Sequence, residues 1–258
     1  MNYGKPSLWN SIPPVTKNLI IINFILWFAT VVFQRFNIDL YDILGMHYWA
    51  SGKFNPAQMI TYMFMHGGLS HIFFNMFALW MFGGALEQYW GGKRFLTYYL
   101  ITGVGAGIIQ QFAWMIEYQP LLTAMNEAIA AGSAEPLLSY QAELGRYFRL
   151  SNLESISVSS IIELKQVFLD LPLTVGASGS VFGILLAFGW LFPQARLMLL
   201  FLPIPIPARI FVAIYALAEL FLGVANFSGD SVAHFAHLGG MLFGIIMILY
   251  WKKKGKLR

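Results

Sequence analysis

Long apolar stretches alternate with short polar or basic segments along most of the chain. One apolar stretch lies between Lys17 and Arg35, and another follows Arg94. A helix of about 20 predominantly apolar residues crosses the hydrocarbon core of a bilayer. The pattern therefore predicts six membrane-spanning helices, at about residues 18–34, 70–89, 95–115, 175–192, 206–225 and 232–251.

Two segments depart from this pattern. Residues 117–170 carry seven acidic and three basic residues, and their helix-forming composition is interrupted at Gly132-Ser133 and Pro136. We expect an extracytoplasmic insertion of two or three short surface helices between the third and fourth spans. No motif in the insertion carries chemistry, so a structural role and a partner-docking role both stay open. Before the fifth span, three prolines at alternate positions in LPIPIPAR predict a rigid, non-helical connector.

The composition agrees with a membrane location. Hydrophobic residues make up 58% of the chain and charged residues 11%, against about 25% charged in soluble domains. We therefore expect an all-α polytopic membrane protein that forms a single domain over residues 1–258. The chain has no cysteine, which excludes disulfides, thiol nucleophiles and thiolate metal sites. We expect no metal and no cofactor.

The distribution of basic residues predicts the topology. The net charge of +4 could indicate a nucleic-acid partner, but the charges follow the predicted spans instead. Six spans put both termini on one side, which would hold eleven of the Lys and Arg residues, against five on the other. Because Lys and Arg concentrate in cytoplasmic loops, we expect cytoplasmic termini in the inner membrane of a cell. The lipid bilayer is the expected partner, and nucleic acid is not.

Strongly polar side chains inside three of the spans are functional candidates, because such groups are costly in a bilayer. The second span contains His71 and Asn75, which lie on one helix face at positions i and i+4. The fourth contains Ser178, and the sixth contains His234 and His237. Taken alone, His71 and Asn75 could form hydrogen bonds between helices, and Ser178 could bond back to the backbone of its own helix.

The positions of small residues connect the serine to one histidine. His237 falls on the same helical stripe as Gly240 and Gly244, and Ser178 falls on a stripe shared by Gly179, Phe182 and Gly183. Small residues spaced four apart let helices approach closely. If the two stripes pack together, Ser178 and His237 meet just below the outer surface. A serine beside a histidine that takes its proton is the minimum for acyl transfer from an amide.

Such chemistry also needs donors for the negative oxygen of the tetrahedral intermediate. Asn75 can donate through its amide and His71 through a ring N–H. The backbone N–H of Ser178 lies at a helix start, where unpaired N–H groups bind anions. We expect Gly176 and Gly179 to keep bulk away from the place where a substrate backbone approaches Ser178.

Three motifs carry a family resemblance. HIFFNMFALWMFGGALEQ, GASGSVFG and AHLGGMLFG occur on three spans in this order, and together they resemble the rhomboid family of intramembrane serine proteases. The resemblance implies a rhomboid-like six-transmembrane-helix bundle that cleaves single-pass transmembrane proteins near the outer membrane boundary. It implies Ser178 as nucleophile and His237 as its base, in a dyad without an acidic third member. It also implies that Asn75 and His71 line the oxyanion hole and that Phe182 stacks on the catalytic imidazole.

The chain departs from the family pattern at two places. Many relatives have tyrosine where this chain has Phe182, and many have a Trp-Arg pair in the first loop, where this chain has Ala57-Gln58.

Two other functions are alternatives to proteolysis. One is a catalytically inactive rhomboid-like binder of membrane proteins, which typically lacks the serine or the histidine. The other is a transporter or proton relay that uses His66, His71 and Glu219, which would favour several intramembrane acids and repeated halves.

Overall fold

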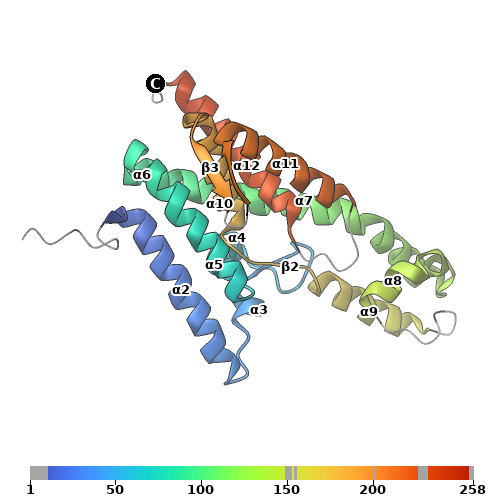
Figure 1. Ribbon diagram of the computed structural model, residues 1–258. Coiled ribbons are helices and arrows are strands. Elements are labelled where there is room, and N and C mark those ends of the chain that lie inside the picture. Colours follow the sequence, from blue (N-terminus) through green and yellow to red (C-terminus); the bar gives the residue numbers. More distant parts are fainter. Residues whose placement is uncertain (1–10, 149–152, 154–155, 200–201, 226–231, 256–258) are drawn as a thin grey trace, which may run out of the picture.

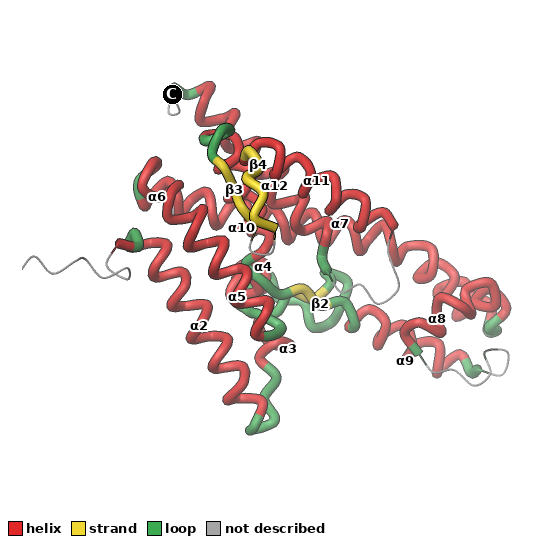
Figure 2. The backbone as a smooth tube through the Cα atoms, in the orientation of Figure 1, coloured by secondary structure: helices red, strands yellow, loops and turns green. Residues whose placement is uncertain are grey.

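The computed structural model describes residues 11–148, 153, 156–199, 202–225 and 232–255. Within them the chain is mainly helical, and the strands form two separate two-stranded ribbons (Figures 1 and 2). The helices of the apolar segments are α2 (Pro14–Gln34), α5 (Leu69–Ala78), α6 (Gly84–Trp90), α7 (Gly92–Ala131), α10 (Ser178–Leu191), α11 (Ala208–Ala225) and α12 (His234–Lys253). The other helices are α3 (Leu40–Leu44), α4 (Gln58–Thr61), η1 (Tyr62–Phe64), η3 (Glu135–Tyr140), α8 (Gln141–Tyr147) and α9 (Val158–Asp170).

The predicted all-α polytopic membrane fold is confirmed. Over the described ranges, five helical segments are long and apolar enough to cross a membrane, and α10 is a further apolar helix of 14 residues. One of the five runs from Leu69 to Trp90, because the π-helical turn η2 (Leu79–Gly83) joins α5 to α6 without a break.

The third helix differs most from its predicted range. Instead of ending at residue 115, α7 continues through Pro120 to Ala131, where Gly132 ends it in the left-handed conformation at φ 69°. The extension is held by packing, since the ring of Tyr118 meets that of Phe168 on α9 at 5.0 Å. The first part of the predicted insertion, residues 117–131, is therefore a continuation of α7, and η3, α8 and α9 follow it.

The proline-rich connector forms part of a β-ribbon. Strands β3 (Arg196–Leu199) and β4 (Leu202–Pro207) pair antiparallel, with Arg196 opposite Pro207. Proline cannot donate to a ladder and is confined to edge strands, and both strands of a two-stranded ribbon are edges. The connector is non-helical, as the proline spacing predicts.

The centre of the bundle is α10, which packs against α7 and α12. All residues from Gly179 to Leu185 are buried, so every face of this helix is covered. By contrast, α11 lies beside α12 with most of its surface open (Figure 1). Leu217 and Phe221 on α11 are 67% and 65% exposed. This arrangement puts the first turn of α10 inside the protein and α11 at its lipid-facing edge.

A buried carboxylate fixes the start of α2. Glu87 accepts the backbone N–H groups of Val15 and Thr16 at 2.9 and 2.7 Å, and the Thr16 hydroxyl at 2.8 Å. The first N–H groups of a helix have no partner inside it and favour a negative charge. Glu87 thus ties α6 to α2.

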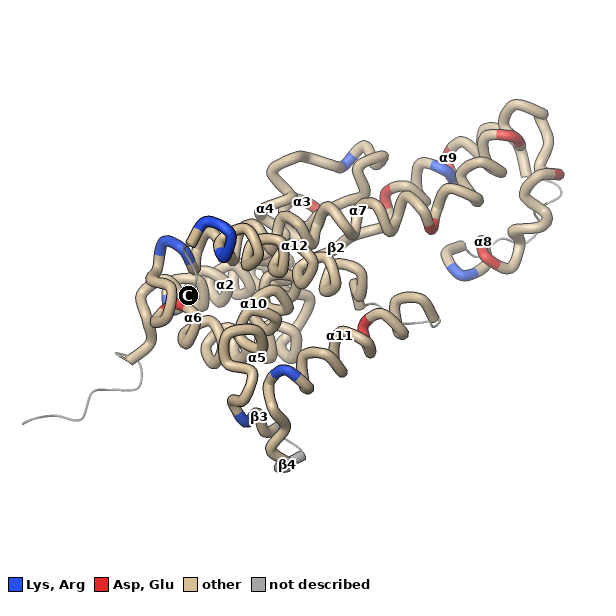
Figure 3. Tube along the Cα trace, turned by 90° about the horizontal axis from the view of Figure 1, so that it is seen from above, with Lys and Arg blue, Asp and Glu red and all other residues tan. Residues whose placement is uncertain are grey.

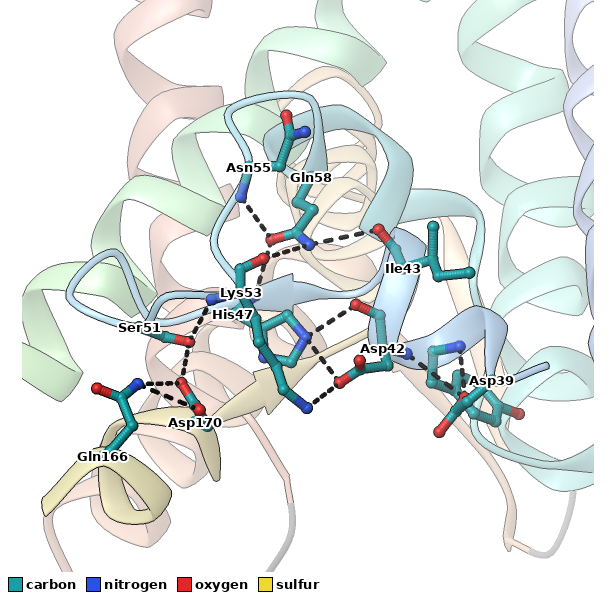
Figure 4. A network of polar contacts seen from close by, with 11 residues as sticks. Asp39, Asp42, Ile43, His47, Ser51, Lys53, Asn55, Gln58, Gln166 and Asp170 are labelled. Atoms are coloured by element: carbon teal, nitrogen blue, oxygen red, sulfur yellow. Dashed lines mark hydrogen bonds and ion pairs between the residues drawn. The ribbon is translucent and has the colours of Figure 1, made fainter. Parts of the chain in front are cut away.

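The side chain of Gln58 organises the first loop, at the position where the family resemblance leads one to expect another residue pair. It is 3% exposed. Its oxygen accepts the N–H groups of His47 and Asn55, and its amide donates to the carbonyls of Ile43 and Lys53 (Figure 4). Four backbone groups of one irregular loop are therefore satisfied by one side chain, which restricts the loop.

The same loop is bound to the insertion. Ser51 donates to Asp170 at the end of α9, and Gln166 contacts the same carboxylate (Figure 4). Strand β1 (Met46–His47) also pairs with β2 (Leu173–Thr174), which directly precedes α10. The first loop, α9 and the start of α10 therefore form one connected unit.

The charged residues are unevenly distributed along the molecule. Figure 3 shows Lys and Arg gathered near α6 and the C-terminal end, and most Asp and Glu towards α7, α8 and α9. A single acidic residue is seen on α11. It is Glu219, and it is buried.

Candidate functional site

Ser178 is the first residue of α10 and is only partly buried. The chain reaches it from β2 through Gly176, whose N–H donates to the carbonyl of Tyr62 at 2.9 Å. Gly176 has a φ of 132°, which L-residues rarely adopt, and a Cβ there would lie 2.8 Å from the His71 ring. Glycine is therefore required for both the backbone conformation and the space.

His237 lies in the first turn of α12 and faces the serine. Its Nε2 is 2.9 Å from the Ser178 hydroxyl oxygen, the distance of a hydrogen bond. The imidazole stacks on Phe182 with ring centroids 4.1 Å apart and planes 7° from parallel. Because Phe182 is one turn after Ser178, a single face of α10 presents the hydroxyl and also holds the ring that meets it.

Close backbone contact between α10 and α12 sets this distance. A Cβ on Gly240 would lie 1.9 Å from the carbonyl oxygen of Gly179. A Cβ on Gly183 would lie 3.0 Å from the carbonyl oxygen of Gly240. The two stripes of small residues do pack together, and no side chain fits between them at these positions.

Gly244, further along the same stripe, has a different neighbour. A Cβ there would lie 2.4 Å from the hydroxyl oxygen of Tyr98 on α7. That hydroxyl donates to the carbonyl of Gly183 at 2.8 Å. Gly244 therefore makes room for a third helix, and the α10–α12 contact is made by the glycines nearer to Ser178.

His71 borders the same space as Ser178. The point that a Gly176 Cβ would occupy is 2.8 Å from the His71 Nε2 and 3.5 Å from the Ser178 hydroxyl oxygen. The Nδ1 of His71 accepts the N–H of Gly67 at 3.4 Å. A neutral ring that accepts at Nδ1 carries its proton at Nε2, so an N–H group is available beside the serine.

Asn75 lies one turn further along α5. It is 6% exposed, and its amide donates to the carbonyl of His71 at 3.0 Å. One of its two N–H groups is thus engaged within its own helix, and the other is available for a further contact.

His66 is buried next to His71. It is 0% exposed, and its ring centroid is 5.0 Å from that of His71. Burial lowers the pKa of His66 to about 3, with a smaller contribution from His71, so the ring is neutral at physiological pH.

Glu219 has no expected part in hydrolysis from its sequence position, yet in the structure it lies against His237. Its Oε2 is 2.9 Å from the Nδ1 of His237 and 2.6 Å from the Nδ1 of His234. The sequence does indicate that Glu219 has a role, because an acidic residue within a span is buried and a buried carboxylate needs partners. Its partners could not be identified from the sequence because they lie on another helix.

The same three residues could hold a metal ion, since their ligand atoms lie within 4.8 Å of one another. A zinc ion about 2.0–2.1 Å from each ligand would keep tetrahedral ligand atoms about 3.3 Å apart. The observed separations of 2.6 and 2.9 Å are shorter and match hydrogen bonds. The arrangement therefore fits a carboxylate that accepts from two imidazoles.

Comparisons with known proteins agree on one family. A family model described as a Rhomboid domain matches residues 53–125 and 141–254. "Rhomboid protein 1, mitochondrial" of Saccharomyces cerevisiae is 28% identical over 264 residues, which cover 97% of this chain and 60% of that protein. "Presenilin-associated rhomboid-like protein, mitochondrial" of Mus musculus is 27% identical over 220 residues, or 79% of this chain and 43% of that protein.

A bacterial protein matches over a shorter stretch. "Rhomboid protease GlpG" of Salmonella newport is 36% identical over 59 residues, or 23% of this chain and 21% of that protein. The chain thus spans between about a fifth and three fifths of the length of these relatives.

Proposed function

This chain belongs to the rhomboid family, and from that premise we propose that it is an intramembrane serine endopeptidase. The observation that carries the proposal is the 2.9 Å contact between the Ser178 hydroxyl and the His237 Nε2. Both residues lie at the starts of apolar helices, at the same end of the α10–α12 pair. Hydrolysis needs water, which the bilayer core does not supply, so a site at one end of the bundle suits the reaction.

The reaction proceeds by nucleophilic catalysis. His237 Nε2 takes the Ser178 proton while the serine oxygen attacks the scissile carbonyl carbon. The resulting oxyanion collapses, the C–N bond breaks, and the protonated imidazole gives its proton to the leaving amine. A water molecule then attacks the acyl-serine ester with His237 as base, which releases the acid and restores the serine.

Three groups are the proposed donors to the oxyanion. They are the His71 Nε2–H, the free N–H of the Asn75 amide and the backbone N–H of Ser178. Donors that are already in place stabilise the developing charge without reorganisation. Since Gly176 adds no side chain beside Ser178, we propose single-pass transmembrane proteins as substrates, cleaved near the outer membrane boundary where their helix unwinds.

The charge distribution supports an orientation. Lys and Arg gather near the C-terminal end in Figure 3, and the positive-inside rule puts that end in the cytoplasm. We propose an inner cell membrane with both termini cytoplasmic and the active site opening to the other side. The relatives bear both mitochondrial and bacterial names, and the charge distribution supports the orientation, not the choice of membrane.

We expect Asn75→Ala to lower kcat by about 100- to 1,000-fold with little change in KM, because its hydrogen bond strengthens as negative charge develops. Asn23→Ala is the matched control. Asn23 is also buried, and its amide likewise donates to a carbonyl four residues earlier, at 2.7 Å. Steady-state kinetics on a transmembrane substrate decides the question: an unchanged kcat with a raised KM would make Asn75 a substrate-positioning residue.

A fluorophosphonate probe tests the proposed function itself. The purified protein in detergent should be labelled at Ser178, and Ser178→Ala should abolish labelling. Ser180→Ala is the matched control, since that buried hydroxyl donates to the carbonyl of Tyr99. Folded protein that binds a tagged transmembrane partner but takes up no label would instead support the inactive rhomboid-like binder.

A further inference from the structure

Glu219 is a buried carboxylate on α11, a helix with most of its surface open. It is 5% exposed, whereas Leu217 and Phe221, two residues to either side, are 67% and 65% exposed. An ionisable group inside a span is costly and is retained where it has partners. The packing of α11 does not require an acid at position 219. The contacts of the Glu219 side chain therefore indicate its role.

Those contacts are two imidazoles on α12. His234 and His237 are three residues apart and therefore share a helix face. Both direct Nδ1 to the same oxygen of Glu219, at 2.6 and 2.9 Å. A carboxylate only accepts hydrogen bonds, so each ring carries its proton on Nδ1.

This choice of tautomer matters for His237. With the proton on Nδ1, its Nε2 presents a lone pair, and that atom faces the Ser178 hydroxyl at 2.9 Å. The ring is then held on three sides: by Glu219 at Nδ1, by Phe182 across its face and by Ser178 at Nε2. The negative charge also stabilises the imidazolium that forms when the serine proton is transferred.

We propose that Glu219 is a positioning residue that extends the Ser178–His237 pair to a three-membered triad, and that His234 anchors Glu219. The inference rests on the proposed protease function. It contradicts the sequence-based expectation of a dyad without an acidic third member. Hydrogen bonding to a carboxylate selects the reactive tautomer and opposes ring rotation.

The decisive variant is Glu219→Gln. Its side chain has nearly the same shape, but its amide can donate to Nδ1 and so favour the unreactive tautomer with the proton on Nε2. We expect kcat to fall by about 10²- to 10⁴-fold with less than about a threefold change in KM. Labelling of Ser178 by the fluorophosphonate should slow in the same proportion, and Glu219→Asp should recover part of the rate.

Glu87→Gln is the matched control. Glu87 is likewise buried within a span, but it caps α2 and lies about four turns along its helical segment from His71. Its variant should lower thermal stability while the folded fraction keeps the wild-type kcat. A wild-type kcat and labelling rate in folded Glu219→Gln would overturn the inference.

A spectroscopic measurement separates this inference from the proposed function and needs no variant at Glu219. In protein labelled with ¹⁵N at histidine, the His237 signals, assigned by their loss in His237→Ala, should show a proton on Nδ1. A proton on Nε2 would overturn the role of Glu219 even in an active enzyme. If no Ser178-dependent labelling occurs, the protease proposal fails, and so does the catalytic role proposed for Glu219. The tautomer of His237 still shows in that case whether the contact with Glu219 exists.

Discussion

Ser178→Ala and His237→Ala should each lower the rate of proteolysis by on the order of 10⁵- to 10⁶-fold while the protein stays folded. The two residues act as a unit, so that losing one costs nearly as much as losing both. The expectation rests on the 2.9 Å contact between their reacting atoms. It is measured by cleavage of a tagged single-pass protein, in co-expression and with purified components, against the double variant as background.

The neighbouring histidine supplies the control for this result. His234→Ala should keep measurable activity, because His234 contacts Glu219 and His237 can still donate to that carboxylate. Cleavage by Ser178→Ala or His237→Ala clearly above that of the double variant would remove the assignment. Inactivation by His234→Ala alone, with His237→Ala active, would show that the other histidine is the base.

The second large effect is expected at a residue without any side chain. Gly240→Leu should abolish activity although every catalytic group remains, because even a Cβ at this position would lie 1.9 Å from the Gly179 carbonyl oxygen. A backbone atom cannot move aside as the end of a side chain can. Helices α10 and α12 must therefore separate, and Ser178 must move away from His237. Gly240→Ala should already lower the rate, and both variants should label more slowly with the fluorophosphonate probe.

Gly145→Leu is the matched control for this prediction. Gly145 lies on α8, and a Cβ there would meet nothing within 4 Å. This variant should keep wild-type activity. Full activity in a folded Gly240→Leu protein would show that the glycine contact does not set the distance between serine and histidine. Thermal unfolding and gel filtration in detergent report whether each variant is folded.

The amino-acid sequence alone predicts the membrane fold and singles out Ser178 and His237, because both depend on patterns within a single helix. Apolar run length identifies a span, and the spacing of small residues along a helix identifies the face that packs. Such periodicities are local and are visible without knowing which helices are neighbours. The same periodicity marks the stripes of Gly179 and Gly240, although their contact with each other is a matter of how α10 and α12 pack.

Features that join different elements were decided by the tertiary structure. The continuation of α7 through Pro120 depends on packing against α9, and composition alone suggests a break. Gln58 stabilises the first loop because four backbone groups converge on it. Glu219 shows the difference most clearly: the sequence marks it as an acid that needs a partner in the membrane, but the partner is chosen by how α11 lies against α12. Hydrophobic pattern determines which residues are buried, whereas the meeting of two buried polar groups depends on the packing of whole helices.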